Sequence, residues 1–316
     1  MSIAAANSTG AARRNDEILD PGSLMRIKSL ELRAKIVVQG FLHGLHRSPY
    51  HGFSVEFSEY RQYSPGDDPR YLDWKLYARS DRHYIKRFED ETNLRCNLVL
   101  DSSRSMSYGS LPYNKAEYAA TLAATLAYFL SLQHDAVGLV RFDERIEDIL
   151  PPQYRPGQLR RLMLALERPA AGRGTDVSEP LRQFAEYVSR RGIVVILSDC
   201  LANLDGLETA LGTLRSRGQD VILFQILDPA ETKFEFTESV LFEDLETGRD
   251  MYVDPQQVRA GYLQKLEAHN QSVRAACDKL GIEYVAMLTD QPVDAALHDF
   301  LQARMRRGRR VTRRAV

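Results

Sequence analysis

The chain has 316 residues, a net charge of −1 and ordinary shares of hydrophobic (44%) and charged (27%) residues, the composition of a globular protein. No apolar run approaches the roughly 18 residues that a membrane span needs. Residues 1–17 lack the apolar core of a secretory signal. The three cysteines, Cys96, Cys200 and Cys277, form no CxxC pair. We therefore expect a protein of the reducing cytoplasm, without a membrane span.

Both ends of the chain are predicted to be tails. Residues 1–20 read as a flexible N-terminal tail, and residues 304–316 carry seven arginines and no acid. Without that basic C-terminal tail the chain has 35 basic and 43 acidic residues, a net charge near −8. The tail is suited to nucleic acid, anionic lipid or an acidic protein face, or it is a solvated end. No aromatic residue interleaves the arginines to stack bases, so specific nucleic-acid binding is not expected.

Residues 21–92 are predicted to form an N-terminal α+β segment. Its expected elements are a helix over 32–45, a strand over 53–60 with alternating apolar residues, a turn in "SPGDDPR" and a strand over 83–90. Charged residues crowd this segment, and four of them are candidates for a partner-binding patch: Arg61, Asp67, Asp68 and Arg70. The alternative is a salt-bridged platform that secures the segment to the rest of the protein.

Residues 93–303 alternate between strands and helices. Strands are expected over 96–101, 136–143, 145–150, 192–199, 220–228 and 283–289. Helices are expected over 114–134, 157–168, 178–190, 204–217 and 256–280. This rhythm predicts an α/β fold, a doubly wound and mostly parallel sheet with helices on both faces.

Two of the expected strands end in an acid, Asp101 and Asp199. In open parallel sheets, ligands bind beyond the carboxyl ends of the strands, where the strand order reverses. If the sheet starts at its centre with 96–101 and returns at 192–199, the two strands are neighbours. Asp101 and Asp199 would then face each other at that edge.

Hydroxyl groups join these two acids in the predicted site. Asp101, Ser103 and Ser105 offer three oxygens from one tight loop, and Thr175 offers a fourth from the glycine-rich loop 171–176. With Asp199, this set of hard oxygen ligands suits Mg²⁺ or Mn²⁺. Two carboxylates only neutralise a divalent ion, so the site has room for a carboxylate from another protein.

Other interpretations of these residues stay open at this point. Serines and an acid at a strand-to-helix junction often cap the helix, because its first turn has unpaired N–H groups. Asp176 is either a supporting residue of the metal site or a loop cap. Cys200 is either a reactive thiol or a small packed side chain.

The site residues and the N-terminal segment resemble known families. "DSSRS", Thr175 in "RGTD" and Asp199 in "LSD" resemble the metal-ion-dependent adhesion site (MIDAS) of von Willebrand factor A domains, and the resemblance covers roughly residues 93–303. Residues 44–93 are similar to the signature of a bacterial family called domain of unknown function 58.

This resemblance implies a von Willebrand A-like fold and a role in binding partners. Members of the family resemble adaptor proteins that are associated with MoxR-type AAA+ ATPases. The expected partner is therefore a MoxR-type AAA+ ATPase, or another protein that supplies a carboxylate to the metal.

Enzymatic activity is the alternative function. The chain has no GxxxxGK[ST], GxSxG or HExxH motif. Asp101 could serve a Mg²⁺-dependent phosphoryl-transfer or hydrolase reaction as a nucleophile. However, Ser103 stands where phosphatases of the haloacid dehalogenase type carry a second Asp. We therefore expect a non-enzymatic adaptor.

Overall fold

The computed structural model divides into two compact units, residues 43–93 and the remainder of the chain. The residues that the structure describes are 20–47, 59–62, 84–87, 94–170, 172, 177–201, 204–236, 240–243 and 250–302.

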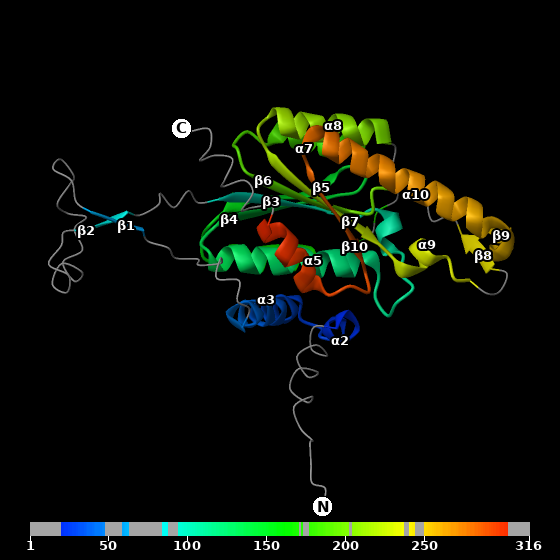
Figure 1. The fold of residues 1–316 in the computed structure, drawn as a ribbon, viewed down its shortest axis with the longest axis horizontal. Helices are drawn as coiled ribbons and strands as arrows, with labels where there is room; N and C mark the ends of the chain where they lie inside the picture. Colours follow the sequence, from blue (N-terminus) through cyan, green and yellow to red (C-terminus); the bar gives the residue numbers. More distant parts are fainter. Residues whose placement is uncertain are drawn as a thin grey trace, which may run out of the picture. The chain divides into compact units, whose positions relative to one another are not determined.

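The larger unit is built on a sheet of six strands in the order β10-β7-β6-β3-β4-β5 (Figure 1). The strands are β3 (Arg95–Asp101), β4 (Ala136–Phe142), β5 (Ile146–Gln153), β6 (Ile193–Ser198), β7 (Asp220–Leu227) and β10 (Glu283–Leu288). All neighbours are parallel except β4 and β5. The strand order reverses between the neighbouring strands β3 and β6, because the chain builds from β3 to β4 and β5 on one side and returns to β6 on the other, as the sequence predicted.

The central strands are apolar because helices cover both of their faces. Every residue of β6 is buried, and so are all residues of β3 after Arg95. Such continuous apolar runs are the mark of a parallel sheet with two covered faces.

Helices cover the two faces of this sheet (Figure 1). On one face lies the largely buried α5 (Lys115–Leu132), beside α6 (Gln158–Leu166). On the other face lie α7 (Ser178–Tyr187), α8 (Leu204–Ser216) and α10 (Pro255–Leu280). The predicted fold class, a doubly wound α/β sheet with helices on both faces, is confirmed.

Two N-terminal helices also belong to the larger unit, α2 (Pro21–Met25) and the beginning of α3 (Leu30–Arg47). Arg33 of α3 donates to the hydroxyl of Thr121 on α5 at 2.9 Å. Residues 21–92 were predicted to form one segment, whereas the structure divides them: residues up to 42 belong to the larger unit, and residues 43–93 form the smaller one.

In the smaller unit the structure describes the end of α3 (residues 43–47) and a short antiparallel strand pair, β1 (Glu59–Gln62) with β2 (Tyr84–Arg87). Arg61 lies in β1 opposite Ile85. The other members of the predicted patch, Asp67, Asp68 and Arg70, lie outside the described residues, as do both predicted tails.

Several short elements were not predicted from the sequence. They are the 3₁₀ helix η2 (Arg104–Ser107), α9 (Pro229–Lys233), the antiparallel strands β8 (Val240–Glu243) and β9 (Asp250–Val253), and a helix over 293–302. β8, β9, α9 and the first half of α10 lie together at one end of the larger unit (Figure 1). Within the described ranges, no helix is both long and apolar enough to cross a bilayer.

The edge strand β5 is irregular. Its register against β4 shifts between Val137 and Leu139. A side chain at Gly138 would meet the backbone nitrogen of Pro152 at 2.6 Å, so this close approach needs a glycine. Pro151 and Pro152 both lie within the strand.

Candidate metal centre

The site begins with Asp101, the last residue of β3, whose side chain is buried. One of its oxygens, Oδ1, accepts a hydrogen bond from the backbone N–H of Ser103 at 2.8 Å. The other, Oδ2, accepts from the hydroxyl of Ser198 on the neighbouring strand β6 at 2.5 Å. The strands thus hold this carboxylate in one orientation.

Burial raises the pKa of Asp101 to about 7, and the nearby charge of Asp199 adds to this effect. The hydrogen bonds from Ser198 and Ser103 act in the opposite direction without cancelling it. The ionised carboxylate is therefore destabilised where it lies, and a nearby cation would relieve that cost.

Ser103 and Ser105 point their hydroxyl oxygens at each other, 3.1 Å apart. Ser103 is the N-cap residue of η2, yet its side chain makes no capping hydrogen bond. α5 is capped instead by Asn114, which forms a capping box with Glu117. The capping interpretation of these serines is therefore wrong. Adjacent oxygens around an octahedral Mg²⁺ are about 3 Å apart for bonds near 2.1 Å, so this spacing fits such an ion.

The glycine-rich loop comes close to the same place. The N–H of Gly172 donates to the backbone oxygen of Ser102 at 3.2 Å. A Cβ at Gly172 would lie 2.6 Å from that oxygen, so only glycine allows the approach. Thr175 and Asp176 lie outside the described residues, and their predicted roles stay predictions.

Asp199, just after β6, is engaged by a residue that the sequence analysis missed. Its Oδ2 lies 2.9 Å from Nζ of Lys115, which is fully buried. The same ammonium lies 2.6 Å from Oε1 of Glu231 on α9. Burial alone would lower the pKa of Lys115, but the charges of Asp199 and Glu231 outweigh it and raise that pKa. Lys115 is therefore a charged bridge between two carboxylates.

This bridge changes the net charge expected at the site. From the sequence, only the carboxylates of Asp101 and Asp199 were expected near the cation. The buried cluster holds three carboxylates, Asp101, Asp199 and Glu231, and one ammonium, Lys115. When all three carboxyl groups are ionised, the sum is two negative charges, which a divalent cation still balances. Asp199 already pairs with Lys115, so Asp101 and the two serines are the better candidates for direct ligands.

Two sequence signals could have revealed this cluster. Lys115 is the first residue of α5, where a cation is disfavoured by the positive end of the helix macrodipole. A lysine at such a position needs nearby acids. "DPAE" (228–231) also has the form of a helix start, with Asp228 as N-cap, Pro229 after it and Glu231 completing a capping box.

Cys200 follows Asp199 and is fully buried. Burial, followed by the charge of Asp199, raises the pKa of its thiol well above the usual value. Cys200 belongs to the hydrophobic core with Val99, Ile196 and Leu207. The packed interpretation of this cysteine is confirmed, because a reactive thiol needs an accessible thiolate.

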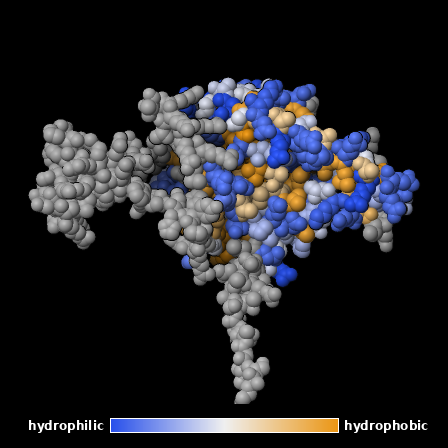
Figure 2. Space-filling view, in the orientation of Figure 1, coloured by the Kyte–Doolittle hydropathy of each residue, from blue (hydrophilic) through white to orange (hydrophobic). Residues whose placement is uncertain are grey.

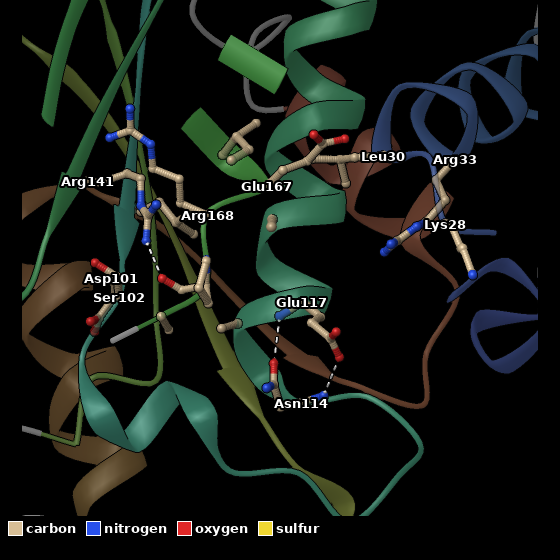
Figure 3. A pocket seen from close by; sticks show the side chains of 16 residues that line it. Lys28, Leu30, Arg33, Asp101, Ser102, Asn114, Glu117, Arg141, Glu167 and Arg168 are labelled. Atoms are coloured by element: carbon tan, nitrogen blue, oxygen red, sulfur yellow. Dashed lines mark hydrogen bonds between the residues drawn. The ribbon is translucent and has the colours of Figure 1, made fainter. Parts of the chain in front are cut away.

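A cleft of about 440 Å³ lies beside the site, between α5, α6 and the N-terminal helices. We call it the charged cleft, after the charged residues that line it: Lys28, Arg33, Asp101, Glu117, Arg141, Glu167 and Arg168. Figure 3 shows Asp101 and Ser102 on one side of it and Lys28 and Arg33 on the other.

The two most buried cations of the charged cleft already have protein partners. Arg141 donates to the backbone oxygens of Ala165 and Pro169, at the end of α6. Arg33 donates to Thr121 and to the backbone oxygen of Ile27. These guanidinium groups connect structural elements, and the mixed charges around them match no single anionic ligand.

The donor set fits a divalent cation by its chemistry. In the part of the chain that the structure describes, no three His, Cys, Asp or Glu side chains converge as a metal site. The predicted site relies on hydroxyl groups instead, and Asp101, Ser103 and Ser105 do come together at the carboxyl edge. Metal binding itself stays a prediction.

The strand order, with its single antiparallel edge strand, confirms the predicted doubly wound and mostly parallel sheet, the architecture expected of a von Willebrand A-like domain. The chain belongs to the family described as protein of unknown function DUF58, whose model matches residues 59–272. The family resemblance stated from residues 44–93 is thus confirmed.

Relatives and solved structures of low identity also match. An uncharacterized protein of Mycobacterium tuberculosis is 27% identical over 296 residues, which is 92% of each chain. The conserved hypothetical protein BatB of Bacteroides thetaiotaomicron is 17% identical, with a TM-score of 0.46, and the match covers 67% of this chain and 99% of BatB. The SpRpn10 VWA domain is 12% identical, with a TM-score of 0.37 over 65% of this chain and 94% of that domain.

Proposed function

We propose that this protein is a non-enzymatic cytoplasmic adaptor that binds a partner protein through a divalent cation at the carboxyl edge of its sheet. Asp101, Ser103 and Ser105 would hold the Mg²⁺ or Mn²⁺, with Thr175 and Asp199 as further members of the site. The bound cation would supply an acceptor for a carboxylate of the partner. The observation that carries this proposal is the pair of serine hydroxyls 3.1 Å apart, which serve no helix cap.

The charge of the site supports a binding role. With its three carboxylates ionised, the buried cluster carries two net negative charges, and because burial raises the pKa of Asp101, a bound cation would favour the ionised form. Both oxygens of Asp101 accept hydrogen bonds within the protein, from Ser103 and Ser198. This arrangement favours a fixed ligand over the alternative, a nucleophile in a phosphoryl-transfer reaction.

The proposed partner is a MoxR-type AAA+ ATPase. This part of the proposal comes from the resemblance of residues 44–93, where Arg61, Asp67, Asp68 and Arg70 are candidates for a second contact. Two weak contacts on one partner strengthen each other through effective concentration.

Calorimetric titration with Mg²⁺ and Mn²⁺ tests the metal site. We expect one binding site in the wild type and none in Asp101→Ala. The matched control is Asp148→Ala, which removes an acid of β5 that pairs with Arg168 instead. Binding that survives Asp101→Ala would contradict the proposed site.

The identity of the partner and the expected absence of enzymatic activity are tested by separate experiments. Affinity purification from lysate, with Mg²⁺ or with EDTA, should recover an AAA+ ATPase only in the presence of metal. Equal recovery by wild type, Asp101→Ala and EDTA-treated samples would exclude a metal bridge. Hydrolysis of p-nitrophenyl phosphate with Mg²⁺, at a rate that Asp101→Ala abolishes, would favour the enzymatic alternative.

A further inference from the structure

A second pocket is lined in part by the segment after β3 that carries Ser103 and Ser105 (residues 102–108), which we call the metal-binding loop. It has a volume of about 230 Å³ and is lined by Ser105, Tyr108, Ala230, Glu231, Phe234, Phe236 and Tyr262. We call it the aromatic pocket. Its residues come from the metal-binding loop, from α9 and the turn that follows it, and from the first half of α10. Figure 2 shows hydrophobic residues in the region of the surface where α9 and this part of α10 lie.

Three of the four rings pack on one another. The ring of Phe234 lies 4.6 Å from that of Tyr262 and 5.0 Å from that of Phe236, between ring centroids. Phe234 also has a positive φ of 47°, a backbone conformation that is uncommon for a large side chain and unfavourable by itself. The surrounding packing therefore holds these rings in place and keeps the pocket in a fixed shape.

The aromatic pocket offers little to a charged ligand. Glu231 is its one acid, but Oε1 is taken by Lys115 at 2.6 Å and Oε2 by the N–H of Asp228 at 2.8 Å. Lys115 lies 5.8 Å from the centroid of the Tyr108 ring, so its charge would repel a second cation. Burial raises the pKa of Tyr262 to about 12, so its hydroxyl is uncharged at neutral pH.

The size of the pocket indicates a single side chain. Sites for small molecules usually measure about 300–1,000 Å³, and this one is smaller. Ser105 belongs both to the proposed metal site and to the wall of the pocket. Residues next to each other in an extended chain have Cα atoms about 3.8 Å apart. A carboxylate on the metal would thus place a side chain one or two residues away at the pocket.

We propose that the aromatic pocket receives a large uncharged side chain (Leu, Ile, Met or Phe) that lies one or two residues from the metal-binding acid in the partner protein. This inference rests on the proposed function and sharpens it. The adaptor recognises an acidic residue together with an apolar neighbour, and the apolar neighbour distinguishes one acidic partner from another. A fully buried apolar side chain contributes about 10- to 100-fold to affinity.

Selection of phage-displayed random 12-residue peptides on the full-length protein tests this inference. In Mg²⁺, we expect enriched peptides to carry Asp or Glu with Leu, Ile, Met or Phe one or two residues away. EDTA should abolish the enrichment. Ala230→Leu fills the pocket from the side of α9. Peptides selected on this variant should lose the preference for the apolar residue and keep the preference for Asp or Glu. The matched control, Lys233→Leu, changes an exposed residue of the same helix and should behave as the wild type.

Labelled synthetic peptides then separate the two contacts. Replacing the apolar residue by Ala should weaken binding to the wild type about 10- to 100-fold and leave binding to Ala230→Leu unchanged. Asp101→Ala should weaken binding of both peptides. Thermal melting of each variant controls for folding, and Phe236→Ala, which removes a wall of the pocket, is the second test of the same preference.

Other outcomes would overturn the inference. Metal-dependent selection of acids with no apolar neighbour refutes the pocket but keeps the proposed function. Apolar peptides selected without an acid, equally well in EDTA, refute the proposed function and the inference together. Enriched Lys or Arg neighbours would show that the pocket is not a site for uncharged side chains. Dimerisation of the wild type that Ala230→Leu abolishes would assign the pocket to a second copy of the chain.

Discussion

The charged cleft and the aromatic pocket are both lined by residues of the metal-binding loop, but they differ in the chemistry of their other lining residues. In the charged cleft, arginine side chains donate hydrogen bonds to the backbone of neighbouring elements, as Arg141 does at the end of α6. In the aromatic pocket the one acid is neutralised and the walls are rings. The larger hollow is therefore a brace between helices, and the smaller one is the better candidate for recognition. A choice by volume alone would have pointed to the charged cleft instead.

The largest effect should come from Lys115, which supports the aromatic side of the loop. Lys115→Met leaves Asp199 and Glu231 buried without their cation, and we expect a loss of about 3–5 kcal/mol in the free energy of unfolding, measured with urea. The control Lys279→Met breaks an exposed pair with Glu208 and should cost far less, because solvent screens exposed charges. Equal losses in the two variants would show that the buried bridge has no special role.

The second effect concerns pH in metal-free protein. The pKa of Asp101 is raised from 3.8 to about 7 by burial and by Asp199, so the folded state binds the proton more tightly than the unfolded state. The contribution of the protonated Asp101 to the free energy of unfolding is then fully present below pH 4 and is lost as the pH rises through 7. Asp101→Asn removes this loss, and in EDTA at pH 8 it should be more stable than the wild type by up to about 4 kcal/mol.

Melting curves at pH 4 and pH 8 check this prediction. The advantage of Asp101→Asn should vanish at pH 4, and Mg²⁺ should reduce it at pH 8 by stabilising the wild type. A variant less stable than the wild type at both values would show that Asp101 is not destabilised where it lies.

A smaller effect is expected in the charged cleft. Arg141→Met removes two hydrogen bonds from a charged donor to the end of α6, and should lower the free energy of unfolding by about 1.5–3 kcal/mol. If this cleft is only a brace, the variant should select the same phage peptides as the wild type at a temperature where it is folded. A changed peptide preference would break the contrast between the two hollows.

The smallest effect on stability should come from the serines. Ser103→Ala and Ser105→Ala remove hydroxyls that cap no helix, so the melting temperature should change by only about a degree or two. Calorimetry should nevertheless show weaker Mg²⁺ binding in both. Clear destabilisation with unchanged metal binding would give these residues a structural role.

The fold was predictable where apolar residues recur at strand or helix spacing because those residues are buried. The apolar run that forms β6, and the alternation of strands with helices, follow from burial of both faces of the sheet. Short elements such as η2 and α9 carry too few residues for a periodic signal, so their position depends on tertiary contacts.

The candidate site was predictable where it follows from topology. Asp101 ends β3 and Asp199 follows β6, and because neighbouring parallel strands end at one edge of the sheet, the two acids lie at that edge, as the sequence order already implied. The bridge from Lys115 to Glu231 joins residues 116 positions apart, and no local pattern encodes such a pair. The aromatic pocket depends in the same way on Phe234 and Tyr262, which come from separate elements.

The two prolines of β5 limit how a partner can approach the sheet. Many domains recognise peptides by letting them add a strand to an exposed border, where free N–H and C=O groups pair with the incoming backbone. Proline has no N–H to offer, and Pro151 and Pro152 occupy consecutive positions of this edge strand. Backbone recognition is thus discouraged along β5, which also protects this border from edge-to-edge aggregation.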